Sequence, residues 1–198
     1  MPVSIGAEVA PGKLSSVVTY LETTAPPRII GEPPAPPGAA IERLETVPVS
    51  LYRDLYRRVG EAWLWWEQLQ VPDDELAARL RDPAVEVFMF RRSGDVIGYA
   101  ELDRREPNAV EIVFFGLVPE AIGQGLGRFF FARMQEIAWQ SDPHRVWLHT
   151  CTEDHPRALG FYKAAGFRPY CRERVIIDDP RSTGLLPAGS APHVPPVR

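Results

Sequence analysis

The chain has 198 residues, of which 45% are hydrophobic and 24% are charged, and its formal net charge is −4. This size and composition fit one globular domain with a hydrophobic core. The negative net charge argues against a nucleic-acid-binding surface, which is normally basic, so no nucleic-acid partner is expected. Cys151 and Cys171 lack the spacing of metal ligands and read as free thiols in a reducing compartment, so no metal is expected.

Residues 1–13 have no basic start followed by an apolar core, so no secretion signal is predicted. The longest apolar run lies near residues 112–118. It is far shorter than the roughly 18 residues that a membrane span needs. We therefore expect a cytoplasmic protein without a membrane partner.

The 21 prolines gather toward the two ends of the chain. Residues 25–38 predict an extended surface segment, and the β-rich residues 15–24 before them predict an edge strand. The residues after 177 show no hydrophobic period, so they are expected to be disordered or held by a partner. We therefore divide the chain into a Pro-rich N-terminal extension (1–40), a central domain (41–178) and a Pro-rich C-terminal tail (179–198).

Hydrophobic periods typical of strands and of helices alternate along the central domain. Strands are predicted at residues 39–47, 85–92, 96–106, 110–118, 145–152 and 167–177. Helices are predicted at residues 49–59, 62–69, 73–80, 124–139 and 156–165, with a break near Gly60. This order predicts an α/β fold with a mixed sheet that contains a three-strand meander.

A glycine-rich stretch, with Gly123, Gly125 and Gly127, joins a predicted strand to a predicted helix. Backbone N–H groups at the positive end of a helix dipole form an anion site, most often for phosphate. The nucleoside-triphosphate loop is excluded because Arg128 follows the last glycine without the required lysine and spacing. The dinucleotide pattern fails because Phe130 occupies the place of its third glycine. A glycine-rich turn without a ligand stays open as an alternative.

Two motifs in this region resemble those of the GNAT superfamily of acyl-CoA-dependent N-acyltransferases. The family's pyrophosphate loop, Arg/Gln-x-x-Gly-x-Gly/Ala, follows a strand that ends in Val-x-Pro; here Leu117-Val118-Pro119 precedes the loop at 122–127. The family's second motif, Asn-x-x-Ala-x-x-hydrophobic-Tyr and then Gly-Phe, is similar to residues 155–162 and 166–167. The resemblance covers roughly residues 85–177. It implies a GNAT-like mixed, mostly antiparallel central sheet flanked by helices.

The resemblance also implies acetyl-CoA as co-substrate, with its pyrophosphate against the glycine-rich loop. The cofactor-binding residues that it implies are Leu117, Val118, Ile122, Gly123, Gln124, Gly125, Leu126, Gly127, Arg128 and His155. The sequence departs from the family pattern at Ile122, where Arg or Gln is usual, and at His155, where Asn is usual. Because backbone amides do most of the phosphate binding in such loops, we expect weaker cofactor binding rather than none, with Gln124 and Arg128 as nearby substitutes.

An amine must lose its proton before it attacks a thioester, because an alkylammonium with a pKa of about 10.4 is not a nucleophile. The strand around Glu111 resembles the one that carries the glutamate base in histone-type family members. An ideal strand would place Glu111 on one face with Val113, Phe115 and Leu117, where partial desolvation would raise its pKa. Glu101, on the neighbouring predicted strand, is the second candidate base. A solvated Glu111, or one paired with an arginine, stays open.

For the leaving thiolate, the resemblance points to Tyr162 as proton donor, and for the oxyanion to a backbone N–H near Leu117 or Val118. A plain core tyrosine is the alternative for Tyr162. His149 is a candidate substrate-binding residue, with a partly buried structural histidine as the alternative. No Asn or Asp is placed to complete a thiol relay with Cys151, so direct transfer is favoured over a covalent intermediate.

Aromatic residues are dense before the meander, in the region that supplies the acceptor site by analogy with the family. Trp63 and Trp66 are predicted to line a pocket for an aromatic or cationic amine, and a hydrophobic core stripe is the alternative. The acceptor stays open between small-molecule and peptide amines, and so does a homodimer.

The predicted function is N-acetyltransferase, an enzyme that moves an acetyl group from acetyl-CoA to an amine by direct attack. A degenerate acyl-CoA-binding or sensing domain without turnover, motivated by Ile122 and His155, is one alternative. The other is an adaptor module whose Pro-rich ends bind partners.

Overall fold

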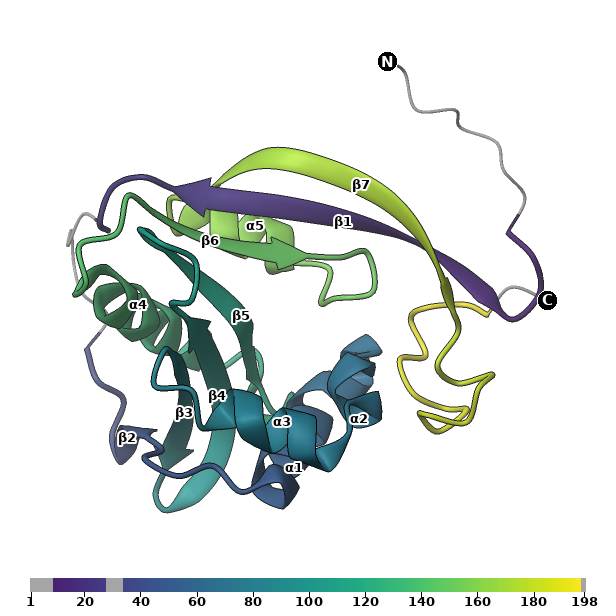
Figure 1. Cartoon of the computed structure of the whole chain (residues 1–198), viewed down its shortest axis with the longest axis horizontal. Coiled ribbons are helices and arrows are strands. Elements are labelled where there is room, and N and C mark those ends of the chain that lie inside the picture. Colours follow the sequence, from purple (N-terminus) through teal and green to yellow (C-terminus); the bar gives the residue numbers. More distant parts are fainter. Residues whose placement is uncertain (1–8, 28–33, 197–198) are drawn as a thin grey trace.

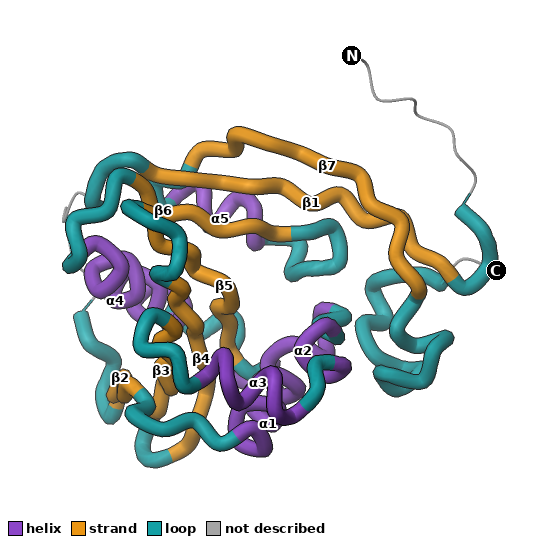
Figure 2. Tube along the Cα trace, viewed as in Figure 1, coloured by secondary structure: helices purple, strands orange, loops and turns teal. Residues whose placement is uncertain are grey.

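The computed structural model describes residues 9–27 and 34–196. Its centre is one seven-stranded sheet in the order β2-β3-β4-β5-β6-β1-β7 (Figures 1 and 2). The strands are β1 (Lys13–Thr23), β2 (Ala39–Arg43), β3 (Val85–Arg92), β4 (Asp95–Asp103), β5 (Ala109–Leu117), β6 (Arg145–Thr150) and β7 (Arg168–Asp178). Neighbouring strands are antiparallel except β5 and β6, which are parallel.

Helices flank the sheet, which confirms the predicted mixed α/β fold. They are α1 (Val49–Gly60), α2 (Glu67–Gln70), α3 (Asp73–Leu80), α4 (Leu126–Trp139) and α5 (Ala158–Ala164), with 3-10 turns η1 (Glu61–Trp63) and η2 (Pro119–Ala121). No helix within the described residues combines the length and apolar content needed to cross a membrane.

The helix α3 shows how local sequence sets an element's bounds. Pro72 precedes the helix, and three acidic residues occupy its first turn, where they complement the helix dipole. Leu76 and Leu80 lie one turn apart and are both buried against the sheet. The predicted range 73–80 is confirmed.

The region 62–69 was predicted as one helix, and this is wrong. It consists of η1, a turn at Leu64 with φ 57°, and the short helix α2. The chain turns here because Trp65 folds back onto Gly60: a Cβ on Gly60 would lie 2.4 Å from the Trp65 ring. Packing of one indole therefore overrides the helical spacing of the aromatic residues.

The strand predicted at residues 15–24 is present as β1, but its predicted position at a sheet edge is wrong. β1 lies inside the sheet, where Thr19–Thr23 pairs with β6 and Lys13–Glu22 pairs with β7. The strand at the neighbouring edge is β7, and β2 forms the opposite edge. β1 therefore belongs to the same sheet as the strands of the central domain.

The C-terminal residues up to 196 pack onto the molecule, so the expectation of a disordered tail is wrong. Arg181 forms an ion pair with Asp179 at 2.8 Å and donates hydrogen bonds to three carbonyl oxygens between residues 190 and 194. Leu186 is buried beside Leu14. One guanidinium with several donors can organise such an irregular segment, although the segment has no hydrophobic period.

We predict that Gly60→Ala lowers the melting temperature, because the new methyl group would overlap Trp65. Overpacking of this kind costs about 1–3 kcal/mol, or roughly 3–10 °C in a chain of this size. Gly160→Ala in α5 is the matched control, because a Cβ there meets no atom within 4 Å. Thermal unfolding should show the control unchanged or slightly stabilised. Equal shifts in both variants would contradict the role of Gly60.

Candidate active site

The parallel strands β5 and β6 pair only where Ala109–Glu111 lies beside Arg145–Trp147. β5 continues to Leu117, so from Ile112 onward it has a strand neighbour only on its β4 side. Figure 1 shows the two strands diverging beyond this point. A free strand edge can pair with an extended ligand, so the divergence marks a candidate site.

A β-bulge decides which way Glu111 faces. β4 pairs Glu101 with Phe114 and Leu102 with Ile112, which leaves Val113 as the extra residue. The bulge puts Glu111 on the face of Phe114, not on the face of Phe115 and Leu117, so the predicted common face is wrong. Phe114 packs against Tyr56 of α1. Glu111 therefore faces the side of the sheet that carries α1 and α3.

The structure brings Glu111 and His149 together at the point where β5 and β6 separate. Glu111 Oε1 lies 3.6 Å from His149 Nδ1, and the two side chains are 21% and 41% exposed. The nearby Glu111 carboxylate raises the pKa of His149. The ring of Tyr20, from β1, lies 5.8 Å from the imidazole. The candidate base thus shares its surroundings with a titratable neighbour from the opposite strand.

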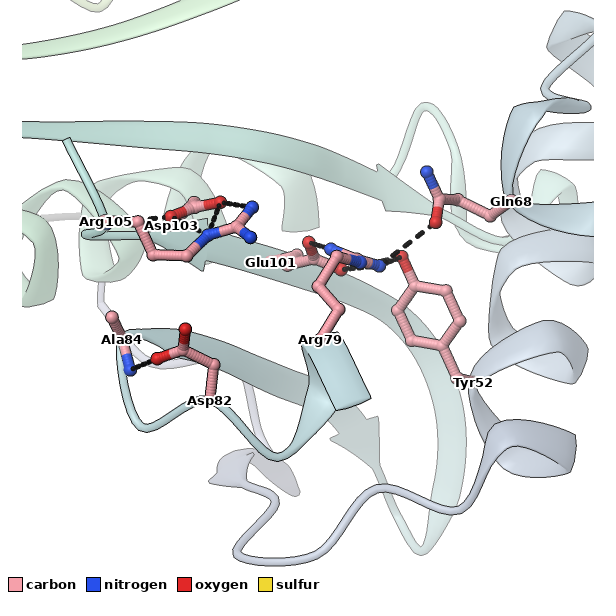
Figure 3. A network of polar contacts seen from close by, with 8 residues as sticks. All are labelled: Tyr52, Gln68, Arg79, Asp82, Ala84, Glu101, Asp103 and Arg105. Atoms are coloured by element: carbon pink, nitrogen blue, oxygen red, sulfur yellow. Dashed lines mark hydrogen bonds and ion pairs between the residues drawn. The ribbon is translucent and has the colours of Figure 1, made fainter. Parts of the chain in front are cut away.

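Glu101, the second candidate base, is fully buried in a polar network beneath α1, α2 and α3 (Figure 3). It forms an ion pair with Arg79 of α3 and accepts a 2.7 Å hydrogen bond from the Tyr52 hydroxyl. Burial raises the pKa of Glu101, although Arg79 opposes the shift. Arg79 also donates to Gln68 at 3.1 Å. Because both Glu101 oxygens already accept hydrogen bonds, this placement favours Glu111 as the base.

The glycine-rich loop runs from the end of η2 into the first turn of α4. Gly123 and Gly125 have φ values of 85° and 79°, which favour glycine, and a Cβ on either would meet no atom within 4 Å. In the part of the chain that the structure describes, the amides of Gly123, Gly125 and Gly127 donate to no other group. Free amides at the start of a 14-residue helix fit a pyrophosphate group.

Side chains around the loop explain how Ile122 can replace a polar residue. Ile122 packs against the core, whereas Gln124 accepts a 2.9 Å hydrogen bond from Arg92 and donates to the Glu120 carbonyl at 2.8 Å. Arg128 is exposed in the first turn of α4. Arg92, at the end of β3, was missed by sequence reasoning because nothing local relates it to the loop.

Three predicted cofactor residues, Leu117, Val118 and Leu126, have buried side chains that belong to the core. Only their backbone groups can therefore meet a ligand. The Val118 amide already donates to the Ile97 carbonyl at 3.0 Å, so Val118 is excluded as the oxyanion donor. The sequence could not show this, because the bond joins two different strand ends.

Tyr162, on α5, packs against the ring of Phe131. Burial, and secondarily the charge of Asp154, raises the pKa of Tyr162 well above its usual value. The hydroxyl therefore stays protonated and can donate a hydrogen bond. Burial also raises the pKa of the Cys151 thiol, which disfavours a thiolate nucleophile.

Asp154 is a site residue that sequence reasoning missed. Its carboxylate accepts hydrogen bonds from Thr150 Oγ1 at 2.6 Å, from the Cys151 amide at 2.9 Å and from Trp65 Nε1 at 3.2 Å. Trp65 in turn packs on Phe114 of β5. Asp154 thus connects the loop after β6 with the opposite side of the diverging strands.

The two candidate acceptor residues occupy different surroundings. The Trp63 ring lies 5.1 Å from the ring of His155, whereas Trp66 packs in a small second core beside Leu64. Burial, followed by the charge of Arg157, lowers the pKa of His155. The alternative interpretation, a hydrophobic core stripe, is confirmed for Tyr52 and Tyr56 of α1, which are fully buried. Trp63 and Trp66 are only partly buried.

A model of the acetyltransferase (GNAT) family matches residues 50–167. The mycothiol acetyltransferase of Jonesia denitrificans is 26% identical over 195 residues, which cover 94% of this chain and 58% of that protein. The mycothiol acetyltransferase of Salinispora arenicola is 30% identical over 138 residues, covering 68% of this chain and 41% of that protein. The chain thus spans about half the length of these relatives.

Solved structures show the same fold. A GCN5-related N-acetyltransferase from Kribbella flavida matches with a TM-score of 0.55 at 17% identity, over 85% of this chain and 60% of that one. The ribosomal-protein-S18-alanine N-acetyltransferase of Escherichia coli matches with a TM-score of 0.54 at 16% identity, over 67% and 79%. Together with the family match, which spans more than half of the chain, the comparisons show that this protein belongs to the acetyltransferase (GNAT) family.

Proposed function

We propose that this protein transfers an acetyl group from acetyl-CoA to an amine by direct attack of the amine on the thioester. The observation that carries the proposal is the separation of β5 and β6 just after Glu111, beside a glycine-rich loop that starts α4. An extended acyl-CoA arm would pair with the free edge of β5, and its pyrophosphate would meet the amides of Gly123 to Gly127.

The residues around the loop fit such a cofactor. Gly123 and Gly125 leave room for phosphate oxygens, and Arg92 and Arg128 supply positive charge that Ile122 does not. When bound, acetyl-CoA supplies the activated carbonyl group. This fit supports a cofactor-binding site more than a turn without a ligand.

Glu111 is the proposed base. It is partly buried, and its Oε1 lies 3.6 Å from His149 Nδ1. A proton that Glu111 takes from the amine would therefore lie within reach of the imidazole of His149. Glu101 remains a positioning residue in this proposal, since its oxygens hold Arg79 and Tyr52.

Tyr162 is the proposed hydrogen-bond donor to the departing thiolate. Its raised pKa keeps the hydroxyl neutral but makes it a weak acid, so it stabilises the sulfur without readily giving up its proton. A thiolate with a pKa of about 8.5 leaves without full protonation. Tyr162 should therefore contribute less to the rate than Glu111.

The names of the relatives suggest which acceptor amine to test. Two relatives are named mycothiol acetyltransferases, so a mycothiol-related amine is the first acceptor to test. The proposal places the reaction in the cytoplasm, in keeping with two free cysteines. Release of free CoA from acetyl-CoA with a panel of amines tests the function. A protein that binds CoA but releases none with any amine would be a binding domain instead.

We predict that Gly125→Glu abolishes acetyl-CoA binding, because the new side chain adds bulk and negative charge where the pyrophosphate would lie. Gly184→Glu is the matched control, since Gly184 has a similar φ of 77° and equally open surroundings but lies in the tail. Both variants should lose similar stability, and calorimetric titration should show binding only in the control. Undiminished affinity in Gly125→Glu would place the cofactor elsewhere.

We predict that Glu111→Gln lowers kcat/KM by about 10²- to 10⁴-fold with nearly unchanged acetyl-CoA affinity, the usual effect of removing a positioned base. The loss should shrink as pH rises, because solvent then deprotonates more of the amine unaided. Steady-state kinetics from roughly pH 6 to about pH 10, a range that approaches the pKa of an alkylammonium, measures this. Glu45→Gln, at an exposed position, is the control. A wild-type rate at neutral pH would exclude Glu111 as the base.

We predict that Tyr162→Phe lowers kcat less than Glu111→Gln does, and by the same factor at every pH. The reason is the raised pKa of Tyr162, which keeps the hydroxyl neutral across the assay range. The full pH profile of kcat is the measurement. If the difference in kcat between Tyr162→Phe and the wild type disappeared above some pH in the assay range, the hydroxyl would ionise at that pH, which contradicts the prediction.

A further inference from the structure

The two sides of the diverging strands are joined again at their open end by a small second core. The η1–α2 region lies on the β5 side. The start of β1, near Leu14, and the end of β7, near Ile177, lie on the β6 side. The C-terminal segment packs against both, as the yellow ribbon beside α2 and the end of β7 in Figure 1 indicates. The second core contains Leu14, Leu64, Leu186 and Ala191, with Trp66, Leu69, Ile177 and Val194 packed against it.

Polar contacts of the same segment reach both sides. Ser190 Oγ donates to Glu61 on the β5 side at 3.2 Å. The ring of His193 hydrogen-bonds the Glu153 carbonyl, in the loop after β6, at 2.9 Å. Trp63 completes the connection, because its ring contacts His193 at 5.3 Å and His155 at 5.1 Å. The segment therefore bridges the two sides rather than covering one of them.

Trp65 adds a direct connection between the same two sides. Its indole nitrogen donates to Asp154 at 3.2 Å while its ring packs on Phe114 of β5. The Trp65–Asp154 hydrogen bond and the C-terminal segment thus both connect the β5 side with the β6 side. Glu111 and His149 lie at the other end, where the strands still pair.

We propose that the C-terminal segment 186–194 makes the enzyme selective for small amine acceptors and excludes polypeptide amines. This inference rests on the proposed function and narrows its substrate class. An extended peptide spans about 3.3 Å per residue, so even five residues occupy roughly 17 Å. A peptide whose terminus reaches Glu111 and whose chain leaves through the open end would have to displace the bridge, whereas a compact amine would not.

The test compares Ser190→Ala/His193→Ala, which removes both polar contacts of the bridge, with a matched control. The control is Thr183→Ala/His144→Ala, which also removes one hydroxyl and one imidazole. Within residues 9–27 and 34–196, the Thr183 hydroxyl bonds only its local Pro180 carbonyl, and His144 is exposed. Each protein is assayed for CoA release with tyramine and with a lysine-free decapeptide that has a free α-amino group.

We expect the wild-type enzyme and the control to prefer tyramine by about 100-fold in kcat/KM. The bridge variant should improve the peptide's kcat/KM about tenfold, with an unchanged KM for acetyl-CoA. Wild-type activity on the peptide within about tenfold of that on tyramine would overturn the inference. An unchanged preference in the bridge variant would also overturn it.

Hydrogen exchange separates failure of this inference from failure of the proposed function. In the bridge variant, the amides of residues 61–66 and 152–155 should exchange faster together, and in the control they should not. Unchanged exchange in both regions would show that the segment is no bridge, whether or not any amine is acetylated. Faster exchange without CoA release from any amine would confirm that the segment connects the two sides. It would reject the acetyltransferase activity, and the proposed selectivity would fall with that activity.

Discussion

The pairing between β5 and β6 ends at Glu111 and Trp147, and the rest of the candidate site depends on this end. The two strands are parallel, so the chain must cross from the end of β5 back to the start of β6. That crossover begins with η2 and the glycine loop and continues as α4. The start of α4 therefore lies beside the free edge of β5, which brings the glycine loop with its free amides and an unpaired strand edge together.

A buried network of polar side chains fixes the helices on the other side of the site. Arg79 and Glu101 form an ion pair out of solvent, and Tyr52 satisfies the remaining carboxylate oxygen. Such pairs contribute little net stability because both charges lose water, but removal of one partner is strongly destabilising. The network joins three helices to β4 (Figure 3), so its value lies in the fixed position of α1, α2 and α3 above Glu111.

Elements outside the matched family region contribute strands to the sheet and connect the ends of the diverging strands. The match covers residues 50–167, whereas β1, β7 and the C-terminal segment lie outside it. β1 fills the place between β6 and β7, and the C-terminal segment bridges the ends of the diverging strands. The parts that surround the proposed acceptor thus come from both ends of the described chain.

The sequence by itself determined the elements whose signals are local. Pro72 and the following acids set the start of α3, and unbroken apolar residues set β3, because these effects act within one turn or one strand. The position of the glycine loop could be read for the same reason. The face of Glu111 could not, since the bulge at Val113 arises from pairing with β4. Tertiary structure also decided the place of β1, the engaged amide of Val118 and the packing of the tail, because each depends on a partner far away in the chain.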